Sequence, residues 1–215
     1  MLTRCLGKVF SHNEQSVRVV ERLEKNGKGL NLTWEVRDGM LNHKTSLKPA
    51  TLEGDIVRLA DKIAYVNHDI DDGIRAGVLT ENQLPKAYTD ILGHSTSERI
   101  NTVILDVIRN SENSDRAKMS DEVKSALFSL REYMFKTLYC NPTVKAEEVK
   151  AERIIETLFR YLSDRPEEMS QEFLQMIDDG EKPEIVVCDY IAGMTDNFAI
   201  EKFEEFYIPR GWSKL

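Results

Sequence analysis

The spacing of apolar side chains is the feature that most constrains the fold of this chain. Apolar residues recur at intervals of three and four along nearly the whole sequence, and no run alternates apolar and polar residues as a β-strand does. The pattern therefore predicts an all-α helical bundle of about eight helices. The expected helices cover about 13–25, 31–42, 52–76, 95–108, 121–139, 144–163, 166–178 and 183–206.

Capping and helix-breaking residues indicate several of these boundaries. Ser95 and Glu98 match a capping box, in which a hydroxyl and a carboxylate satisfy the first free amides of a helix. Asn141 and Pro142 are expected to stop one helix, and Pro183 suits the first turn of the last one. The sequence shows no internal repeat and no linker that would divide the bundle.

Composition and charge argue against several classes of protein. The 215 residues include 29 Lys and Arg against 37 Asp and Glu, a net charge of −8, which argues against nucleic acid as the main partner. No apolar run is long enough for a signal peptide or a membrane span, so a cytoplasmic location without a membrane partner is expected. Cys5, Cys140 and Cys188 are far apart in the sequence, as expected for free thiols in a reducing cytosol.

The segment 55–76 is the most informative of the expected helices. At about 100° per residue, one of its faces is an apolar stripe that should be buried. The stripe consists of Ile56, Leu59, Ile63, Val66, Ile70 and Ile74. The opposite face, within an arc of about 120°, carries Asp61, Lys62, Tyr65, His68, Asp69 and Asp72. Most such faces are solvated surfaces, but three carboxylates beside one lysine, with a tyrosine at the centre, also suit a site; periodicity leaves both interpretations open.

A functional face would show itself in a particular arrangement of these side chains. Asp61, Tyr65, His68 and Asp69 would line one concavity, and the apolar stripe would be buried behind them. A second expectation concerns the helix at 121–139, whose apolar side chains are predicted to lie in the core. These side chains are Leu127, Leu130, Phe135, Leu138 and Tyr139.

Four stretches, in order from about residue 9 to 200, resemble motifs of the HD-superfamily dNTP triphosphohydrolases. They are His12-Asn-Glu-Gln-Ser16 with Arg18, Asp61-Lys62-x-x-Tyr65-x-x-x-Asp69, Arg99-Ile-Asn-Thr-Val-Ile-Leu-Asp106-Val-Ile, and Asp189-Tyr-Ile-Ala-Gly-Met-Thr-Asp196. The resemblance implies an HD-domain-like fold, with residues 1–110 as the C-terminal part of the catalytic core and residues 111–215 as a helical region packed on it. For the last stretch, a packed, hydrogen-bonded corner is favoured over a site.

The resemblance also implies a reaction and a role for each matched residue. The reaction is hydrolysis of a deoxynucleoside triphosphate to a deoxynucleoside and triphosphate, with a divalent metal such as Mg²⁺ or Mn²⁺. Asp61 would be a metal ligand, Lys62 would contact the triphosphate, and Tyr65 with Asp69 would read the sugar 3′-hydroxyl. His12 is expected to act as a catalytic residue near the phosphates, and Arg99 to contact a phosphate or an effector.

The sequence departs from the family pattern at the metal site. That site takes an upstream His, a His-Asp doublet and a distant Asp, of which only Asp61 is matched, since His68-Asp69 comes after the position of the last ligand. We therefore expect the isolated chain to be inactive, with no metal necessarily bound, and to be a fragment, a shortened gene product or an internal-start product. Uncovered apolar surface is expected to make it self-associate as a homo-oligomer. The alternative is a non-catalytic helical module for nucleotide binding or oligomerisation.

Overall fold

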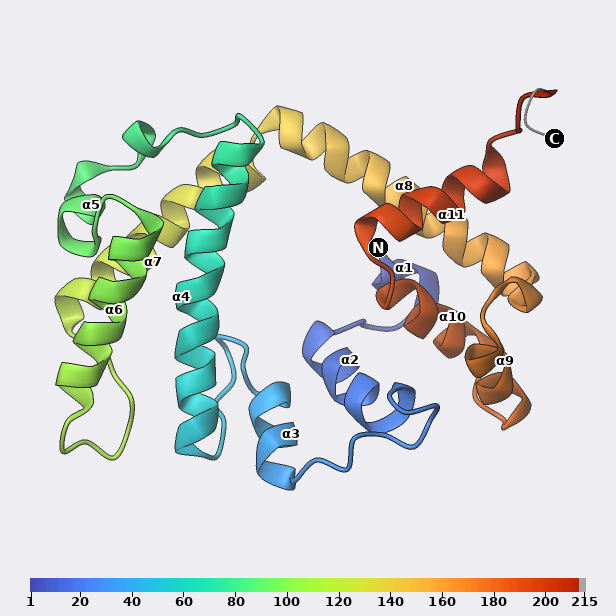
Figure 1. The fold of residues 1–215 in the computed structure, drawn as a ribbon, viewed down its shortest axis with the longest axis horizontal. Helices are drawn as coiled ribbons and strands as arrows, with labels where there is room; N and C mark the ends of the chain where they lie inside the picture. Colours follow the sequence, from blue (N-terminus) through green and yellow to red (C-terminus); the bar gives the residue numbers. More distant parts are fainter. Residues whose placement is uncertain (213–215) are drawn as a thin grey trace. The chain divides into compact units, whose positions relative to one another are not determined.

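The computed structural model describes residues 1–212 of the chain (Figure 1). Within these residues all regular structure is helical, with eleven α-helices and four short π-helical or 3₁₀ turns. The all-α prediction is confirmed, whereas the expected number of about eight helices is wrong.

Three features of the chain account for the additional helices. Helices α1 (Leu2–Leu6) and α5 (Lys86–Leu92) have five and seven residues, which is too short to give a periodic apolar pattern. The single helix expected at 183–206 is divided into α10 (Pro183–Ala192) and α11 (Asp196–Tyr207). Gly193 ends α10, and the Thr195 side chain caps α11 by accepting a hydrogen bond from the Phe198 amide at 3.2 Å.

The chain forms two compact units. Unit 1 comprises Met1–Asn31 and Ala146–Leu215, and unit 2 comprises Leu32–Lys145. The division at residue 110, which the family resemblance implies, separates a catalytic core from the helical region packed on it. That division stays a prediction.

Unit 2 is built around a long central helix, α4 (Leu52–Arg75), which packs against α6 and α7. The other helices of this unit are α3 (Trp34–Leu41), α5, α6 (Thr96–Ser111) and α7 (Asp121–Met134), and its short turns are η2 (Glu81–Gln83) and η3 (Phe135–Tyr139). The core consists of Ile63, Val66, Ile70, Leu79, Leu84, Leu92, Val103, Val123, Ala126, Leu127, Leu130 and Met134. As predicted, the middle of the apolar stripe of α4 is buried in this core.

The two ends of that stripe are not buried. Ile56 is 55% exposed and Ile74 is 38% exposed, so their predicted burial is wrong. Both side chains lie in end turns of α4, beyond the central turns that contribute to the core of unit 2. The helical pattern gives the direction of a side chain but not how far along the helix its neighbours extend.

The N-terminus of α6 is close to the predicted capping box. The Ser95 hydroxyl accepts a hydrogen bond from the Glu98 amide at 3.2 Å, as expected. The Glu98 carboxylate accepts from the amide of His94 at 2.7 Å, one residue before the position in a regular box. Two orphan amides at this end are thereby satisfied.

Unit 1 consists of both ends of the chain. Its N-terminal part holds α1, α2 (His12–Arg18) and the π-helical turn η1 (Val19–Leu23). Its C-terminal part holds most of α8 (Pro142–Asp164), the 3₁₀ turn η4 (Pro166–Glu168), α9 (Gln171–Asp178), α10 and α11. The core consists of Leu158, Phe159, Leu162, Met169, Val186, Val187, Cys188 and Ile191.

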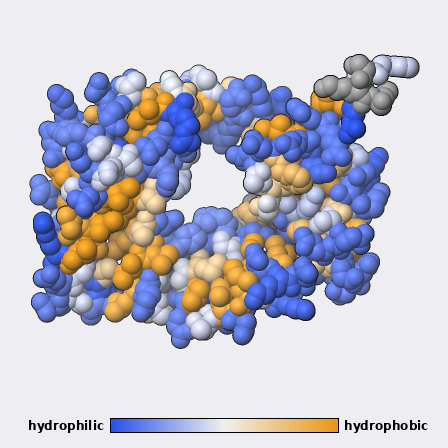
Figure 2. Space-filling model, viewed as in Figure 1, coloured by the Kyte–Doolittle hydropathy of each residue, from blue (hydrophilic) through white to orange (hydrophobic). Residues whose placement is uncertain are grey.

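Apolar side chains also reach the surface of unit 2. Ile56 and Val57 on α4 and Ile104 and Ile108 on α6 are all exposed, and Figure 2 shows hydrophobic residues gathered over these two helices. Among residues 1–212, no helix combines the length and apolarity that crossing a membrane requires. The cytoplasmic location stays a prediction.

Candidate functional site

A groove in unit 2 runs along one flank of α4, where the end of α7 and the turn η3 face that helix. We call it the α4–α7 groove. It has a volume of about 530 Å³ and is lined by Tyr65, Asp69, Phe128, Arg131, Glu132, Phe135 and Tyr139. Aromatic rings, two carboxylates and a guanidinium thus share one open hollow, which is a composition that suits a polar organic ligand with a flat ring.

The polar floor of the groove is a short chain of hydrogen bonds. The hydroxyl oxygens of Tyr65 and Tyr139 lie 2.6 Å apart, and the Tyr139 hydroxyl donates to Asp69 Oδ1 at 3.1 Å. An ionised carboxylate only accepts, so the single proton of Tyr139 points to Asp69 and the Tyr65 hydroxyl donates to Tyr139. Two helical elements distant in sequence therefore meet through three polar side chains.

Burial determines the protonation of this chain of hydrogen bonds. Burial raises the pKa of Asp69, while the hydrogen bond from Tyr139 acts in the opposite direction. Burial, followed by the hydrogen bond with Tyr65 and the charge of Asp69, raises the pKa of Tyr139 well above its usual value. The Tyr139 hydroxyl therefore keeps its proton, and remains a hydrogen-bond donor, at higher pH than an ordinary phenol does.

Several cationic side chains lie near one another beside the groove. Burial lowers the pKa of Lys62 on α4, and the nearby charges of Arg58, Arg131 and Lys124 lower it further, while the charge of Asp61 acts in the opposite direction. The Lys62 ammonium lies 5.8 Å from the centre of the Phe128 ring. Arg131 also acts on the carboxylate of Asp69, so its charge reaches both Lys62 and the hydrogen-bonded chain. Clustered cations that repel one another favour a bound anion.

The structure separates the residues that α4 was expected to bring together. Tyr65 and Asp69 line the groove, with Lys62 half-buried beside it. Asp61 and His68 are exposed on the same helix and lie outside the groove lining. The expectation that all four residues line one concavity is therefore correct for Tyr65 and Asp69 only. The physical reason is that α7 flanks one edge of the polar face, toward which Lys62 and Asp69 point.

Arg99 lies in the interior of unit 2. Its side chain is 1% exposed and donates to Asn67 Oδ1 at 3.0 Å, to Thr96 Oγ1 at 3.2 Å and to the Glu81 carboxylate. The Thr96 hydroxyl in turn donates to Asp71 at 2.7 Å. This network joins α6 to α4 and η2, so a phosphate would reach the guanidinium only if the network opened. Its role toward a phosphate or an effector stays a prediction.

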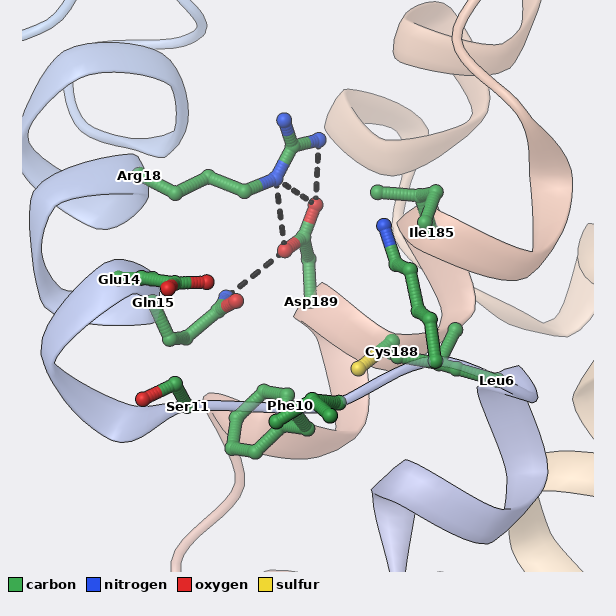
Figure 3. A pocket seen from close by; sticks show the side chains of 11 residues that line it. Leu6, Phe10, Ser11, Glu14, Gln15, Arg18, Ile185, Cys188 and Asp189 are labelled. Carbon is green, nitrogen blue, oxygen red and sulfur yellow. Dashed lines mark hydrogen bonds and ion pairs between the residues drawn. The ribbon is translucent and has the colours of Figure 1, made fainter.

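His12 belongs to unit 1, where it is the exposed first residue of α2. The same helix is fastened to α10 by an ion pair shown in Figure 3. Arg18 Nε lies 2.9 and 2.8 Å from the two oxygens of Asp189, and Gln15 Nε2 donates to Asp189 Oδ1 at 2.7 Å. The catalytic role expected of His12 stays a prediction.

The ion pair borders a small pocket of about 120 Å³, lined by Leu6, Lys8, Val9, Phe10, Ser11, Glu14, Gln15, Arg18, Ile185, Cys188 and Asp189. Asp189 is 1% exposed and its oxygens are already occupied by Arg18 and Gln15. The hydrogen bond to Asp189 raises the pKa of Arg18. This geometry supports the packed-corner interpretation of the stretch beginning at Asp189, since its carboxylate is used to hold two helices together.

Tyr139 and Arg131 are groove residues that the sequence analysis missed. Tyr139 was expected in the core with Phe135, but Phe135 is 59% exposed and Tyr139 is half-buried at the groove. A signal was present, because Phe128, Arg131, Phe135 and Tyr139 follow one another at helical spacing on one face. That face interleaves aromatic and charged residues, which is atypical of a core.

The described residues do not form a complete site for the divalent metal that the family resemblance implies. Among residues 1–212, no three His, Cys, Asp or Glu side chains gather closely enough to hold a metal ion. Asp61 alone supplies one carboxylate, whereas a stable divalent site takes several oxygen ligands. The residues described therefore do not fit a metal by themselves, and the role of Asp61 as a ligand stays a prediction.

Comparison with known proteins gives matches along nearly the whole chain. Residues 117–205 match the family described as the phosphohydrolase-associated domain. The relatives that match include three proteins from different organisms, each named "deoxyguanosinetriphosphate triphosphohydrolase-like protein". The one from Caldanaerobacter subterraneus is 48% identical over 99% of this chain and 62% of its own length. The one from Clostridium perfringens is 47% identical over 94% and 61%, and the one from Geobacter sulfurreducens is 33% identical over 93% and 65%. The chain thus spans about three fifths of the length of these relatives.

Proposed function

We propose that this chain, which is a homologue of the deoxyguanosinetriphosphate triphosphohydrolase-like proteins, binds a deoxynucleoside triphosphate in the α4–α7 groove. The observation that carries the proposal is that Tyr65 and Asp69, which would read a hydroxyl, line one hollow together with Arg131, while the Lys62 ammonium lies beside that hollow near Phe128. A nucleotide needs both, because it presents a sugar hydroxyl and several phosphate charges on one molecule.

Tyr65 and Asp69 would hold the sugar. A sugar hydroxyl both donates and accepts, so it is matched by a carboxylate, which accepts, and by a phenol, which donates. Tyr65 OH and Asp69 Oδ1 already bind to the two sides of one hydroxyl group in the free chain. Bonds of this kind orient a ligand even where their net contribution to affinity is modest.

Lys62 and Arg131 would hold the phosphates. No ion pair of the described residues involves either side chain, and the charges of Lys62 and Arg131 raise each other's free energy. An anion placed between them would relieve this repulsion, and the Lys62 ammonium, 5.8 Å from the centre of the Phe128 ring, would meet it beside the groove. Binding of triphosphate should therefore raise the pKa of Lys62 back toward its ordinary value.

Hydrolysis to a deoxynucleoside and triphosphate is proposed as the activity of a protein that supplies the remaining family metal ligands. In such a protein a divalent metal would polarise the phosphate that is attacked. Asp61 would contribute one ligand, and His12 would act near the phosphates. The isolated chain, in which only Asp61 matches the four ligands of the family pattern, is proposed to bind the nucleotide without turnover.

Calorimetric titration of the full chain with dGTP tests the binding. We expect saturable binding that Lys62→Met and Tyr65→Phe each weaken by roughly tenfold, the cost of one charge-assisted or neutral hydrogen bond. Lys150→Met is a matched control, because Lys150 is an exposed lysine of unit 1 paired with Glu147, and it should leave the affinity unchanged. Equal weakening by the control, or no effect of the two groove variants, contradicts the proposal.

A product assay separates binding from turnover. The chain is incubated with dGTP and Mg²⁺ or Mn²⁺, and deoxyguanosine and triphosphate are measured by ion-exchange chromatography. We expect no release above the spontaneous rate. Release at rates typical of enzymes, abolished by Asp61→Ala, would overturn the statement that the chain alone does not turn over the nucleotide.

A further inference from the structure

Tyr139 stands between the two residues to which the proposed function assigns the sugar hydroxyl. It comes from η3, a single π-helical turn at the end of α7, in which the Cys140 amide bonds to the carbonyl of Phe135 at 3.3 Å. Turns of this kind often occur at functional sites. Its hydroxyl accepts from Tyr65 and donates to Asp69, so it makes one bond of each kind within the groove.

These two bonds are the same pair that a sugar hydroxyl would make there. We propose that Tyr139 is an internal substitute for the ligand, whose hydroxyl occupies the sugar-hydroxyl position in the free chain and is displaced when a deoxynucleotide binds. This inference rests on the proposed function, since it takes the Tyr65–Asp69 pair to be the hydroxyl-reading set. The inference goes beyond the proposed function because it assigns a role to Tyr139. The Tyr139 hydroxyl would compete with the sugar hydroxyl and so set the affinity and specificity for the nucleotide.

The surroundings of Tyr139 allow such a displacement. Its ring stacks on one side against Phe135, with centroids 5.8 Å apart and planes inclined by 25°. Phe135 is itself mostly exposed, so the pair lies at the rim of the groove and outside the buried core of unit 2. A rotation of the Tyr139 side chain would expose the Tyr65 and Asp69 polar atoms to the groove without opening the core.

The chemistry of the substitute matches that of the ligand. A phenol with an ordinary pKa would begin to ionise in alkaline solution and would then lose its ability to donate. Burial and its two partners raise the pKa of Tyr139, so the hydroxyl keeps its proton, as a sugar hydroxyl does. In the free chain Tyr139 also satisfies Asp69, whose half-buried carboxylate would otherwise lack its hydrogen bond.

Competition predicts an unusual effect of removing the Tyr139 hydroxyl. In Tyr139→Phe the pair Tyr65 and Asp69 is left without its internal partner, so a ligand hydroxyl no longer has to replace an existing bond at each side. We expect the affinity for dGTP to rise by about tenfold. A residue that simply contacted the nucleotide, or merely supported the groove, would give unchanged or weaker binding on the same substitution.

The experiment compares two nucleotides on the full chain by calorimetric titration. dGTP carries the 3′-hydroxyl, and 2′,3′-dideoxyguanosine triphosphate lacks it. We expect Tyr139→Phe to bind dGTP about tenfold more tightly than the wild-type chain while binding of the dideoxy nucleotide changes by less than about twofold. Tyr133→Phe is the matched control, because that hydroxyl donates to the Gln83 carbonyl at 2.8 Å outside the groove lining, and it should change neither affinity.

The outcomes distinguish this inference from the proposed function. If the wild-type chain prefers dGTP over the dideoxy nucleotide but Tyr139→Phe gains no affinity for dGTP, the inference is overturned and the proposed function stands. If the wild-type chain binds neither nucleotide, the inference and the proposed function both fail. They also both fail if the wild-type chain and Tyr139→Phe each bind the two nucleotides equally tightly, because Tyr65 and Asp69 then do not read the 3′-hydroxyl. Should Tyr139→Phe not fold, as judged by circular dichroism, Tyr139→Met removes the same hydroxyl and is used in its place.

Discussion

Replacing Arg18 with Met removes the cation that fastens α2 to α10 within unit 1. In the wild-type chain, Nε of Arg18 lies 2.9 and 2.8 Å from the two Asp189 oxygens, and Nη2 lies 2.7 Å from Oδ2. Asp189 is 1% exposed, and without Arg18 its charge would keep only the hydrogen bond from Gln15 at 2.7 Å. The substitution therefore leaves a buried carboxylate with one neutral partner.

The expected cost follows from the burial of the two partners. Removing one partner of a buried ion pair costs about 3–5 kcal/mol. The Arg18 side chain is 24% exposed, so water reaches part of the pair, and we expect a loss near about 3 kcal/mol. For a chain of this size each kcal/mol lowers the midpoint of thermal unfolding by about 2–4 °C, which gives a decrease of roughly 6–12 °C.

A double-mutant cycle distinguishes the pair from simple loss of packing. Arg18→Met, Asp189→Asn and the double variant are unfolded in urea and followed by circular dichroism at 222 nm. In the double variant no charge is left without a partner, and we expect it to lose less stability than Arg18→Met alone. A loss below about 1 kcal/mol for Arg18→Met, or a double variant whose loss equals the sum of the two single losses, would refute the reasoning.

Three further predictions concern charge, thiols and apolar surface. Burial raises the pKa of Asp69 above 3.8, so ionisation of this carboxyl lowers the stability of the folded state. Asp69→Asn should therefore gain stability relative to the wild-type chain as the pH rises from 4 to 7. A difference in urea midpoints that does not change with pH would argue against this. Exposed Cys140 should react rapidly with a disulfide reagent at pH 8. Cys188 should react slowly, because burial raises its pKa to about 11. Equally fast labelling of the two thiols, measured by mass spectrometry, would contradict the prediction. The double variant Ile104→Glu, Ile108→Glu should self-associate less than the wild-type chain in sedimentation velocity, because the two apolar side chains are 45% and 55% exposed. A wild-type chain that stays monomeric at high micromolar concentration would show the expectation to be wrong.

The sequence predicted the part of the fold that depends on helical phase. In α4 the spacing of apolar residues identified Ile63, Val66 and Ile70 as buried, because neighbours pack against the middle of a long helix. It failed for Ile56 and Ile74, since phase does not reveal where the neighbouring helices end. The short helices α1 and α5 were missed for a related reason, as one or two turns carry too little pattern.

The candidate site was predicted on one helix but not across two. Tyr65 and Asp69 lie in the groove as the helical face suggested, while Asp61 and His68 lie outside it because the neighbouring helix α7 covers only one flank. The partner Tyr139 was assigned to the core, since an aromatic residue in an apolar helix is usually buried. Which of two aromatic positions faces a groove is decided by tertiary packing, and a single sequence does not carry that information.

The most direct test of the central claim is nuclear magnetic resonance of the chain with carbon-13 at the phenol carbon of its seven tyrosines, titrated with dGTP. If the α4–α7 groove binds the nucleotide, the resonances of Tyr65 and Tyr139 should shift together along one saturable curve, because they share a hydrogen bond. Those of Tyr161 and Tyr207, whose rings meet edge to face in unit 1, should stay in place. Stationary Tyr65 and Tyr139 resonances at saturating dGTP, or shifts confined to the tyrosines of unit 1, would contradict the account.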